Sequence, residues 1–349
     1  MEMERFKNKK VLIVGVGKTG FKLINFFNKL ECEIRVTDIK PIFDLNKSVK
    51  KLKKINPTPE MTFGEHRDED FLDADVIVYS SAVDPELPQI QLARQNGKEV
   101  YSEFALANLL CKKPIIAVCG SLGRTTVAHM VGFTLKLEGK KVFIGGTSDT
   151  PFIEFSMLPD KEEIDYVVVE VSAIQMRRLE NFHPHLVVFT NISDTYPEEH
   201  FSSAGEYIET KLSIIKTLSP DDILVVNFDK LANNTFFRNA NCQTYWYSRK
   251  SFVNLGVMGE IQGTHFHQRR IHSNINYHSE FRVNKMRIVG QKNRENLLAA
   301  VTACKALEIS DKSIQDCIEK FPGIPHRLEF LMDKNGVCFY NDSKAENME

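Results

Sequence analysis

The chain has 349 residues, of which 42% are hydrophobic and 26% are charged, and its formal net charge is -1. This length leaves room for two or three domains with cores of their own, and the near-neutral charge argues against generic nucleic-acid binding. Seven scattered cysteines without a CxxC pair indicate reduced thiols, and no apolar stretch reaches membrane-spanning length. We therefore expect a cytoplasmic protein that binds neither nucleic acid nor membrane.

Residues 1–111 alternate short apolar runs with amphipathic segments, which predicts a Rossmann-like α/β domain. Strands are expected at residues 9–16, 33–40 and 74–83, and helices at 19–30 and 88–97.

The segment VGVGKTG, residues 14–20, follows the first predicted strand and opens a helix. Gly15, Gly17 and Gly20 would let a phosphate approach the backbone at the helix N-terminus. Asp38 follows roughly 20 residues later, where a dinucleotide-binding fold holds a ribose hydroxyl. Glycine turns after strands also serve packing, so nucleotide or nucleotide-sugar binding and a purely structural turn both remain open.

Residues 112–325 predict a second α/β domain. Its apolar runs place strands at 113–120, 140–146, 166–172, 184–192 and 221–229, and a helix at 294–307. Residues 244–278 indicate a β-rich excursion within it. Its four histidines suggest a metal site, but without a thiol or an i, i+4 pair we favour a polar β-loop; they are His265, His267, His272 and His278.

The segment GSLGRTT, residues 120–126, follows a predicted buried strand and has the layout of a phosphate-binding loop. Only two residues separate Gly120 from Gly123, and Arg124 stands where such loops carry a lysine. Thr125 or Thr126 would supply the hydroxyl that binds Mg²⁺. Arginine keeps the charge but not the adaptable geometry of an ammonium group. The alternative is a plain strand-turn-helix with an exposed arginine.

Eight segments, taken in order, resemble the Mur ligases, most closely the branch that adds D-glutamate to UDP-N-acetylmuramoyl-L-alanine. The resemblance runs from about residue 10 to the end, through VGVGKTG, GSLGRTT, EVSAIQ, NIS with GEYIETK, VVNFD, GQKNRENLLAA, FPGIPHRLEF and YNDSKAEN. It implies a P-loop-type central domain and a monomeric, cytoplasmic enzyme of peptidoglycan precursor synthesis. In that reaction ATP, with Mg²⁺, phosphorylates the substrate carboxylate, and the amine of D-glutamate attacks the acyl phosphate.

The resemblance also implies site residues. Arg124, Glu170 and Lys211 would be catalytic, and Thr125, Glu170 and Lys211 would hold metal, with Lys211 at the position of a lysine that becomes carbamylated. The UDP-sugar would contact Lys18, Thr19, Asp38, Ser80 and Lys344. ATP would contact Gly120, Ser121, Leu122, Gly123, Arg124, Thr125, Thr126, Asn293, Asn296, Arg327 and Asp342. Without the resemblance, Lys211 reads as a solvated helix lysine. For Glu170 the alternative is a surface carboxylate at a strand end, which the otherwise apolar run disfavours.

The sequence departs from the family pattern at several positions besides Arg124. Tyr196 stands where the family has a histidine that reaches a metal, and Thr195 replaces the preceding aspartate. Thr147 replaces an asparagine of a sugar-contacting loop, and Lys292 replaces the histidine of an HN pair. A protonated phenol is a poor ligand for Mg²⁺ at neutral pH.

The family's third domain, which binds the incoming amino acid, is expected to be truncated, so that residues 326–349 form a linker and its start. A catalytically impaired paralogue or fragment that binds UDP-sugar or nucleotide without turnover is therefore an alternative to an active ligase. A nicotinamide oxidoreductase would explain VGVGKTG and Asp38 but none of the later segments.

Overall fold

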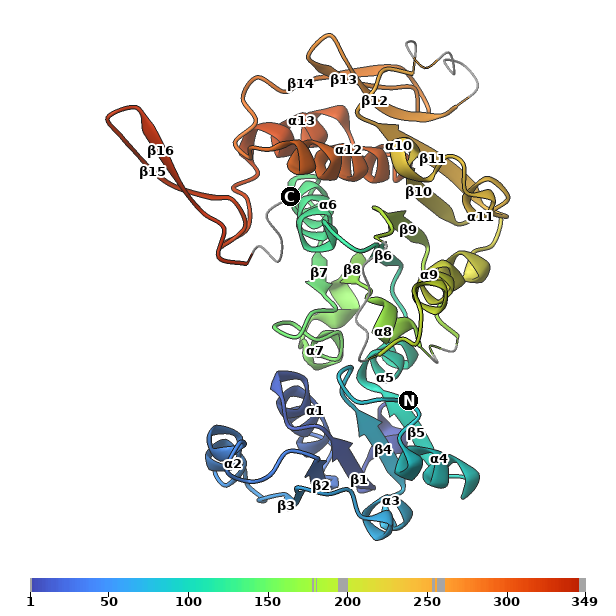
Figure 1. Ribbon diagram of the computed structural model, residues 1–349, viewed down its shortest axis with the longest axis vertical. Helices are drawn as coiled ribbons and strands as arrows, with labels where there is room; N and C mark the ends of the chain where they lie inside the picture. The colour runs from blue at the N-terminus through green and yellow to red at the C-terminus, as the bar shows by residue number, and fades with distance from the viewer. Residues whose placement is uncertain are drawn as a thin grey trace.

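A computed structural model describes residues 2–177, 179, 181–193, 200–252, 255 and 261–344. Two α/β units, each built on its own sheet, follow one another along the long axis, and a small hairpin projects to one side (Figure 1). A Rossmann-like unit followed by a P-loop-type unit is the predicted fold class, which is confirmed.

The first sheet consists of five parallel strands in the order β3-β2-β1-β4-β5. Because the strand order reverses beside β1, a crevice forms at the carboxyl ends of β1 and β4, where α/β sheets bind ligands. The strands are β1 (Lys10–Val14), β2 (Glu33–Asp38), β3 (Glu60–Phe63), β4 (Val76–Tyr79) and β5 (Glu99–Ser102). The helices are η1 (Glu4–Phe6), α1 (Lys18–Asn28), α2 (Asn46–Leu52), α3 (Asp68–Asp73), α4 (Pro88–Gln95) and α5 (Glu103–Leu110).

The second sheet has nine strands in the order β14-β13-β12-β11-β10-β9-β6-β8-β7. Across the sheet, the neighbouring strands β7, β8, β6, β9, β10, β11 and β12 pair parallel. At the other edge, β13 pairs antiparallel with both β12 and β14. The β-rich excursion predicted at 244–278 is therefore a continuation of this second, central sheet. The strands are β6 (Ile115–Cys119), β7 (Val142–Gly145), β8 (Tyr166–Glu170), β9 (Leu186–Phe189), β10 (Ile223–Asn227), β11 (Gln243–Ser248), β12 (Gly263–His267), β13 (Arg270–Ser273) and β14 (Ser279–Arg282).

On one face of the second sheet, α6 (Arg124–Leu137) packs against α12 (Gln291–Ala306) and α13 (Asp311–Lys320). The predicted helix at 294–307 lies within α12, and Cys304 is buried in this layer. The remaining helices are α7 (Glu154–Met157), η2 (Lys161–Glu163), α8 (Ala173–Met176), α9 (Ala204–Leu212), η3 (Ser213–Thr217), α10 (Phe228–Leu231) and α11 (Thr235–Arg238).

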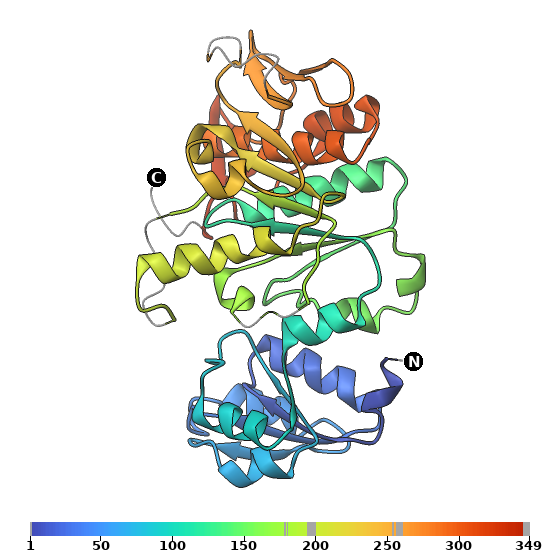
Figure 2. The same cartoon turned by 90° about the vertical axis from the view of Figure 1, so that its right-hand side faces the viewer.

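A single apolar cluster joins the two units. It runs from the α1 side of the first sheet through α5 into the central sheet. In α5, Phe104 packs against Phe152 and Phe182, with ring centroids 5.1 Å and 5.4 Å apart. Figure 2 shows α1 and α5 at this junction, where both contact α7 of the second unit.

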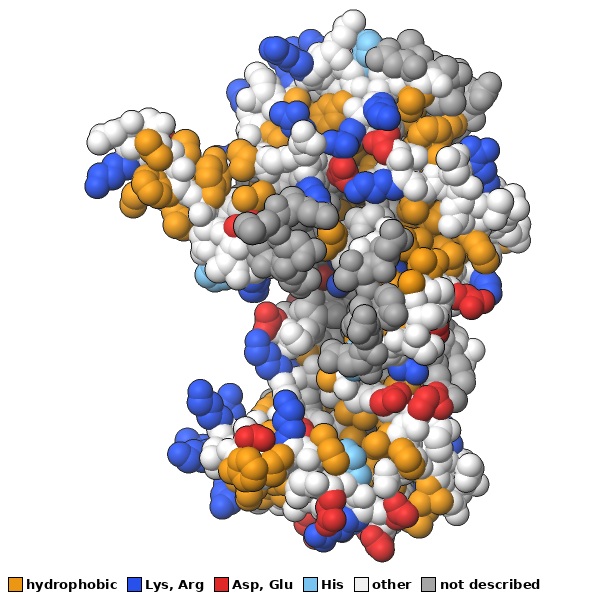
Figure 3. Space-filling view, in the orientation of Figure 1, with side chains coloured by type: hydrophobic (Ala, Val, Ile, Leu, Met, Phe, Trp, Pro, Cys, Tyr) orange, Lys and Arg blue, Asp and Glu red, His pale blue; other side chains and the backbone are white. Residues whose placement is uncertain are grey.

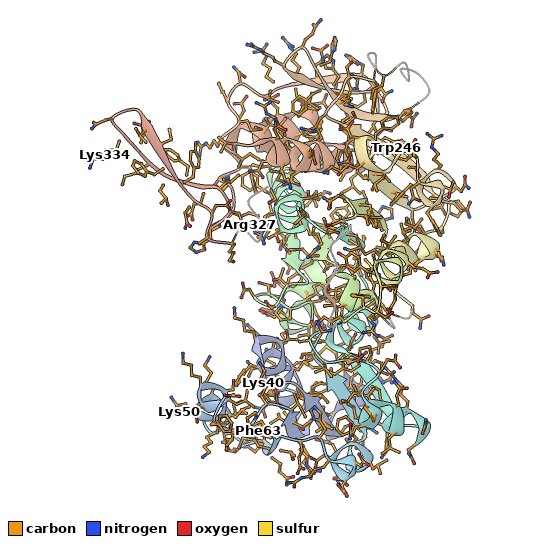
Figure 4. The ribbon with its side chains drawn as sticks, in the orientation of Figure 1. Lys40, Lys50, Phe63, Trp246, Arg327 and Lys334 are labelled. Atoms are coloured by element: carbon orange, nitrogen blue, oxygen red, sulfur yellow. The ribbon has the colours of Figure 1, made fainter. Side chains whose placement is uncertain are left out.

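Strands β15 (Glu329–Lys334) and β16 (Val337–Asn341) form the projecting hairpin. Figure 4 shows Arg327 at its base beside α6 and Lys334 at its far end. Within the described residues, no helix combines the length and apolar character that crossing a bilayer requires.

Candidate functional site

The loop between β6 and α6 has a shape that only glycine permits at two positions. Gly120 has φ of +127° and Gly123 has φ of +86°. A Cβ atom on Gly120 would lie 2.0 Å from Thr190 Oγ1, and one on Gly123 would lie 2.3 Å from Asn296 Oδ1. The loop therefore depends on glycine both for its backbone conformation and for its close packing.

The residues after β9 hold this loop in place. The Asn191 side-chain amide donates to the Leu122 carbonyl at 2.9 Å, and its Oδ1 accepts from the Leu122 amide at 3.0 Å. Thr190 Oγ1 donates to the same carbonyl at 2.7 Å. Because β9 and β6 are neighbours in the sheet, the loop is held by side chains from an adjacent strand end.

Arg124 is half-buried and engaged, not the exposed arginine of the structural alternative. Its Nη1 donates to the carbonyl of Gly120 and to that of Ser121, the latter at 2.9 Å. Lys211 Nζ donates to the same Gly120 carbonyl at 2.7 Å. Two basic side chains thus meet at one backbone oxygen of the loop.

Lys211 is 1% exposed, so its interpretation as a solvated helix lysine is wrong. Burial, together with the charge of Arg124, lowers the pKa of its ammonium group to about 7. The Lys211 Nζ lies 4.8 Å from the centre of the Tyr207 ring on the same helix. At neutral pH a substantial fraction of Lys211 is therefore an uncharged, nucleophilic amine.

Glu170 ends β8, which pairs directly with β6, and is buried rather than a surface carboxylate. Burial raises the pKa of its carboxyl group, and a hydrogen bond from Thr125 with the charge of Arg124 partly opposes that rise. Thr125 Oγ1 donates to Glu170 Oε2 at 2.9 Å. A carboxylate and a hydroxyl beside a phosphate loop are the hard oxygen donors that Mg²⁺ prefers, so these residues fit the metal.

A cleft of about 720 Å³ opens over this loop and α12. It brings together the residues predicted to contact ATP, except that Gly120 does not line it. Ser121 to Thr126 form one wall, and Asn293, Asn296, Arg327 and Asp342 lie around them. Lys344, predicted for the UDP-sugar, and Lys292 also line this cleft.

Three further charged residues of the cleft were not predicted. The Glu295 carboxylate on α12 forms ion pairs with Lys230 Nζ and Arg249 Nε, each with an N–O distance of 2.9 Å. Figure 3 shows Lys and Arg side chains gathered over α10 and α12 with acidic side chains between them. The sequence does carry a signal for them, since Lys230 and Arg249 closely follow β10 and β11, and neighbouring parallel strands end at the same edge of a sheet.

A second pocket, of about 420 Å³, lies between the two units. Lys18, Thr19 and Ser80 from the first unit line it together with Arg124 and Glu170 from the second. Gln175, Thr147 and His200 also line it.

Asp38 lies outside the lining of this second pocket. Its two carboxylate oxygens accept from the backbone amides of Val16 and Lys40, both at 3.0 Å, and so order the glycine turn. Lys18 pairs with Asp149, whose other oxygen lies 3.9 Å from Lys344 Nζ, so Asp149 links the first unit to the end of the described chain.

Two departures from the family pattern, Thr195 and Tyr196, lie outside the described residues.

Comparisons with known proteins find similar sequences along nearly the whole chain. A model of the Mur ligase middle domain matches residues 118–304, and one of the MurD-like N-terminal domain of Mur ligases matches residues 9–102. The UDP-N-acetylmuramoylalanine--D-glutamate ligase of Bdellovibrio bacteriovorus is 30% identical over 351 residues, covering 99% of this chain and 75% of that protein. The corresponding ligase of Alkaliphilus metalliredigens is 30% identical over 345 residues, covering 98% and 74%.

Solved structures share the fold. The UDP-N-acetylmuramate-alanine ligase of Thermotoga maritima matches with a TM-score of 0.58 at 18% identity, over 96% of this chain and 74% of that one. A pseudomurein peptide ligase type C from Methanothermus fervidus matches with a TM-score of 0.52 at 20% identity, over the same two shares.

Proposed function

The chain belongs to the Mur ligase family, and from this premise we propose that it joins D-glutamate to UDP-N-acetylmuramoyl-L-alanine through an acyl phosphate formed from ATP. The observation that carries the proposal is the position of Arg124, which lines both the cleft over the phosphate loop and the pocket between the units. A phosphoryl group can pass from a nucleotide in the cleft to a sugar-linked carboxylate in the pocket only where the two sites adjoin, and Arg124 lies at that place.

In this proposal the 720 Å³ cleft holds ATP, with its phosphates against the backbone amides of the loop and the start of α6. Thr125 and Glu170 would hold Mg²⁺, which supplies compensation for the phosphate charge. Asn293 and Asn296 would lie near the base, and Arg327 and Asp342 would close the cleft from the side of the hairpin.

The pocket between the units would take the UDP-sugar, with Lys18, Thr19 and Ser80 as contacts and Asp38 ordering the turn that precedes them. Lys344 reaches this region through Asp149. The carboxylate of the L-alanyl group would then face Arg124, which would offset the charge that develops during phosphoryl transfer.

Lys211 would act as a carbamate. Its uncharged amine would add to CO₂, forming an N–C bond and releasing one proton, so that a neutral amine becomes an anionic carbamate whose oxygens can bind metal; starting from the ammonium form, a second proton is released. The buried position of Lys211 and the lowered pKa of its ammonium group support this role.

A second candidate function is binding of both ligands without turnover. It is favoured by the Arg124 guanidinium group, which donates to two loop carbonyls. In this arrangement the arginine would stabilise the loop and contribute less to the transferred phosphoryl group.

Phosphate release from ATP distinguishes the two candidates. The ligase account predicts release only when UDP-N-acetylmuramoyl-L-alanine and D-glutamate are both present, and loss of that release in Glu170→Gln. With the UDP-substrate alone, hydroxylamine should trap the acyl phosphate as a hydroxamate. Calorimetric binding of both ligands with no phosphate in any combination would establish the binding protein instead.

A further inference from the structure

The β13–β14 edge of the central sheet carries a cluster that the reaction does not use. His272 on β13 lies opposite Glu280 on β14, and His278 directly precedes β14. One ligand atom from each of the three lies within 4.8 Å of the others, and no other such group of His, Cys, Asp or Glu occurs in the described part of the chain.

The distances within the cluster match a tetrahedral metal site. Glu280 Oε1 lies 3.5 Å from His272 Nδ1 and 3.4 Å from His278 Nε2. Ligand atoms about 2.0–2.1 Å from a tetrahedral Zn²⁺ are about 3.3–3.4 Å from one another. The two imidazole ligand atoms lie within 4.8 Å of each other, so an ion bound by all three atoms needs at most a modest approach of the two rings.

The hydrogen bonds orient the three ligands. His278 Nε2 is within hydrogen-bond distance of Glu280 Oε1, at 3.4 Å, so a bound ion would displace the proton at this nitrogen. His272 Nε2 lies 3.2 Å from the His267 carbonyl, which can only accept, so this nitrogen carries the proton and Nδ1 keeps its lone pair. Arg270 donates to Glu280 Oε2 at 3.0 Å, which fixes the carboxylate and leaves Oε1 facing the two imidazoles. Such outer contacts orient ligands in metal sites, and here the carboxylate also offsets the charge of Arg270.

The neighbours of the cluster hold it in position. The ring of His265 stacks on that of His272 at 5.6 Å with an interplanar angle of 16°. On the other side, Lys305 is buried and donates to Ser279 Oγ at 3.0 Å, so the residue after His278 is fixed. The His272 side chain is 15% exposed and that of His278 is 61% exposed, which leaves an open side for entry and for a water ligand.

We propose that His272, His278 and Glu280 form a Zn²⁺ site that joins β13 to β14, with water completing the coordination. Two imidazoles and one carboxylate suit Zn²⁺, whereas Mg²⁺ and Ca²⁺ prefer oxygen ligands throughout. The site is separate from the proposed ATP cleft, because none of its three residues lines that cleft.

A second group in the chain provides a matched control. His183 Nε2 lies 3.0 Å and His185 Nδ1 4.0 Å from oxygens of Asp222. The nearer oxygen, Oδ2, already accepts from the amide and hydroxyl of Ser219, both at 2.7 Å. This carboxylate is therefore committed to the fold, and we expect no metal there.

The test is calorimetric titration of the whole chain with ZnCl₂ in excess MgCl₂, which saturates sites built of oxygen ligands. We expect one tight equivalent per chain, weakened at least about tenfold in Glu280→Gln and in His278→Ala and unchanged in His183→Ala. Both altered side chains are partly exposed, so the variants should fold, and circular dichroism checks this. Co²⁺ in place of Zn²⁺ should give an absorption spectrum that both variants lose.

The proposal is overturned if the wild-type chain shows no saturable single equivalent, or if Glu280→Gln and His278→Ala bind Zn²⁺ as tightly as the wild type. It is equally overturned if His183→Ala abolishes the tight phase.

Discussion

Glu103, the first residue of α5, is 2% exposed, and its Oε1 accepts from the Ile153 amide at 2.7 Å. Burial raises the pKa of its carboxyl group from 4.5 to about 7. The folded chain therefore keeps a proton that the unfolded chain releases in this interval. Its contribution to stability is complete below pH 4.5 and is lost as the pH rises through 7.

We predict that Glu103→Gln gains stability relative to the wild type as the pH rises from 4.5 to 7, because the amide cannot ionise and its oxygen still accepts from Ile153. The relative gain in the free energy of unfolding is on the order of 3 kcal/mol. Urea unfolding at pH 5 and pH 8 measures it. The exposed Glu69→Gln should show no such trend, and a constant difference between Glu103→Gln and wild type would contradict the account.

Single residues also show where sequence reasoning stops. The segment GSLGRTT predicted a glycine turn between a strand and a helix, and this turn forms, whereas its phosphate binding stays a prediction. Nothing local indicates that Arg124 turns back onto the carbonyls of the turn. Lys211 stands one turn after Tyr207 on the apolar face of α9, but lysine is a residue type that is rarely buried, so its type favoured an exposed side chain. It is buried because α9 packs over the end of β6, a contact between segments about 90 residues apart.

At the scale of elements, the loop between β6 and α6 packs directly on α12, because Gly123 lies against the Asn296 side chain. We predict that Gly123→Ala weakens Mg-ATP binding at least about tenfold, since the new methyl group must displace the Asn296 amide and move the loop. Calorimetric titration with Mg-ATP measures the effect.

The matched control is Gly139→Ala, just after α6. Gly139 has φ of +83°, close to that of Gly123, but a Cβ there meets nothing within 4 Å. Both substitutions impose a similar backbone strain of about 1 kcal/mol, yet only Gly123→Ala should weaken the binding of Mg-ATP. Equal losses in both variants would mean that strain alone governs binding.

The buried parallel strands of both sheets were predictable, because they read as continuous apolar runs such as those at 115–119 and 166–170. The parallel strands β3 and β5 were missed, because most of their residues are only partly buried and form no apolar run. The order of the strands was not predictable, because long-range contacts decide which strands pair. For the same reason the continuation of the second sheet through β11 to β14 was not predictable. For the same reason Lys230, Arg249 and Glu295, from three separate elements, were missed although they meet in the cleft.

At the scale of the whole molecule, two pockets share one side chain. Thr19 lines only the pocket between the units, Asn296 lines only the cleft over the loop, and Arg124 lines both. We predict that Thr19→Ala weakens binding of UDP-N-acetylmuramoyl-L-alanine about tenfold and leaves Mg-ATP binding unchanged, and that Asn296→Ala does the reverse.

Arg124→Ala should weaken the binding of both ligands. Separate calorimetric titrations of the three variants with each ligand measure the pattern. If Thr19→Ala and Asn296→Ala each affected both ligands equally, the two pockets would not be the separate sites that the structure indicates.

The central claim is that the loop with Arg124 binds ATP as it stands, and calorimetric titration of the chain with Mg-ATP, beside an Arg124→Lys variant, tests it most directly. The account predicts one equivalent of Mg-ATP bound by the wild-type chain, because its glycines, Asn191 and Arg124 already hold the loop amides in place. Binding by Arg124→Lys alone, with none by the wild type, would contradict it.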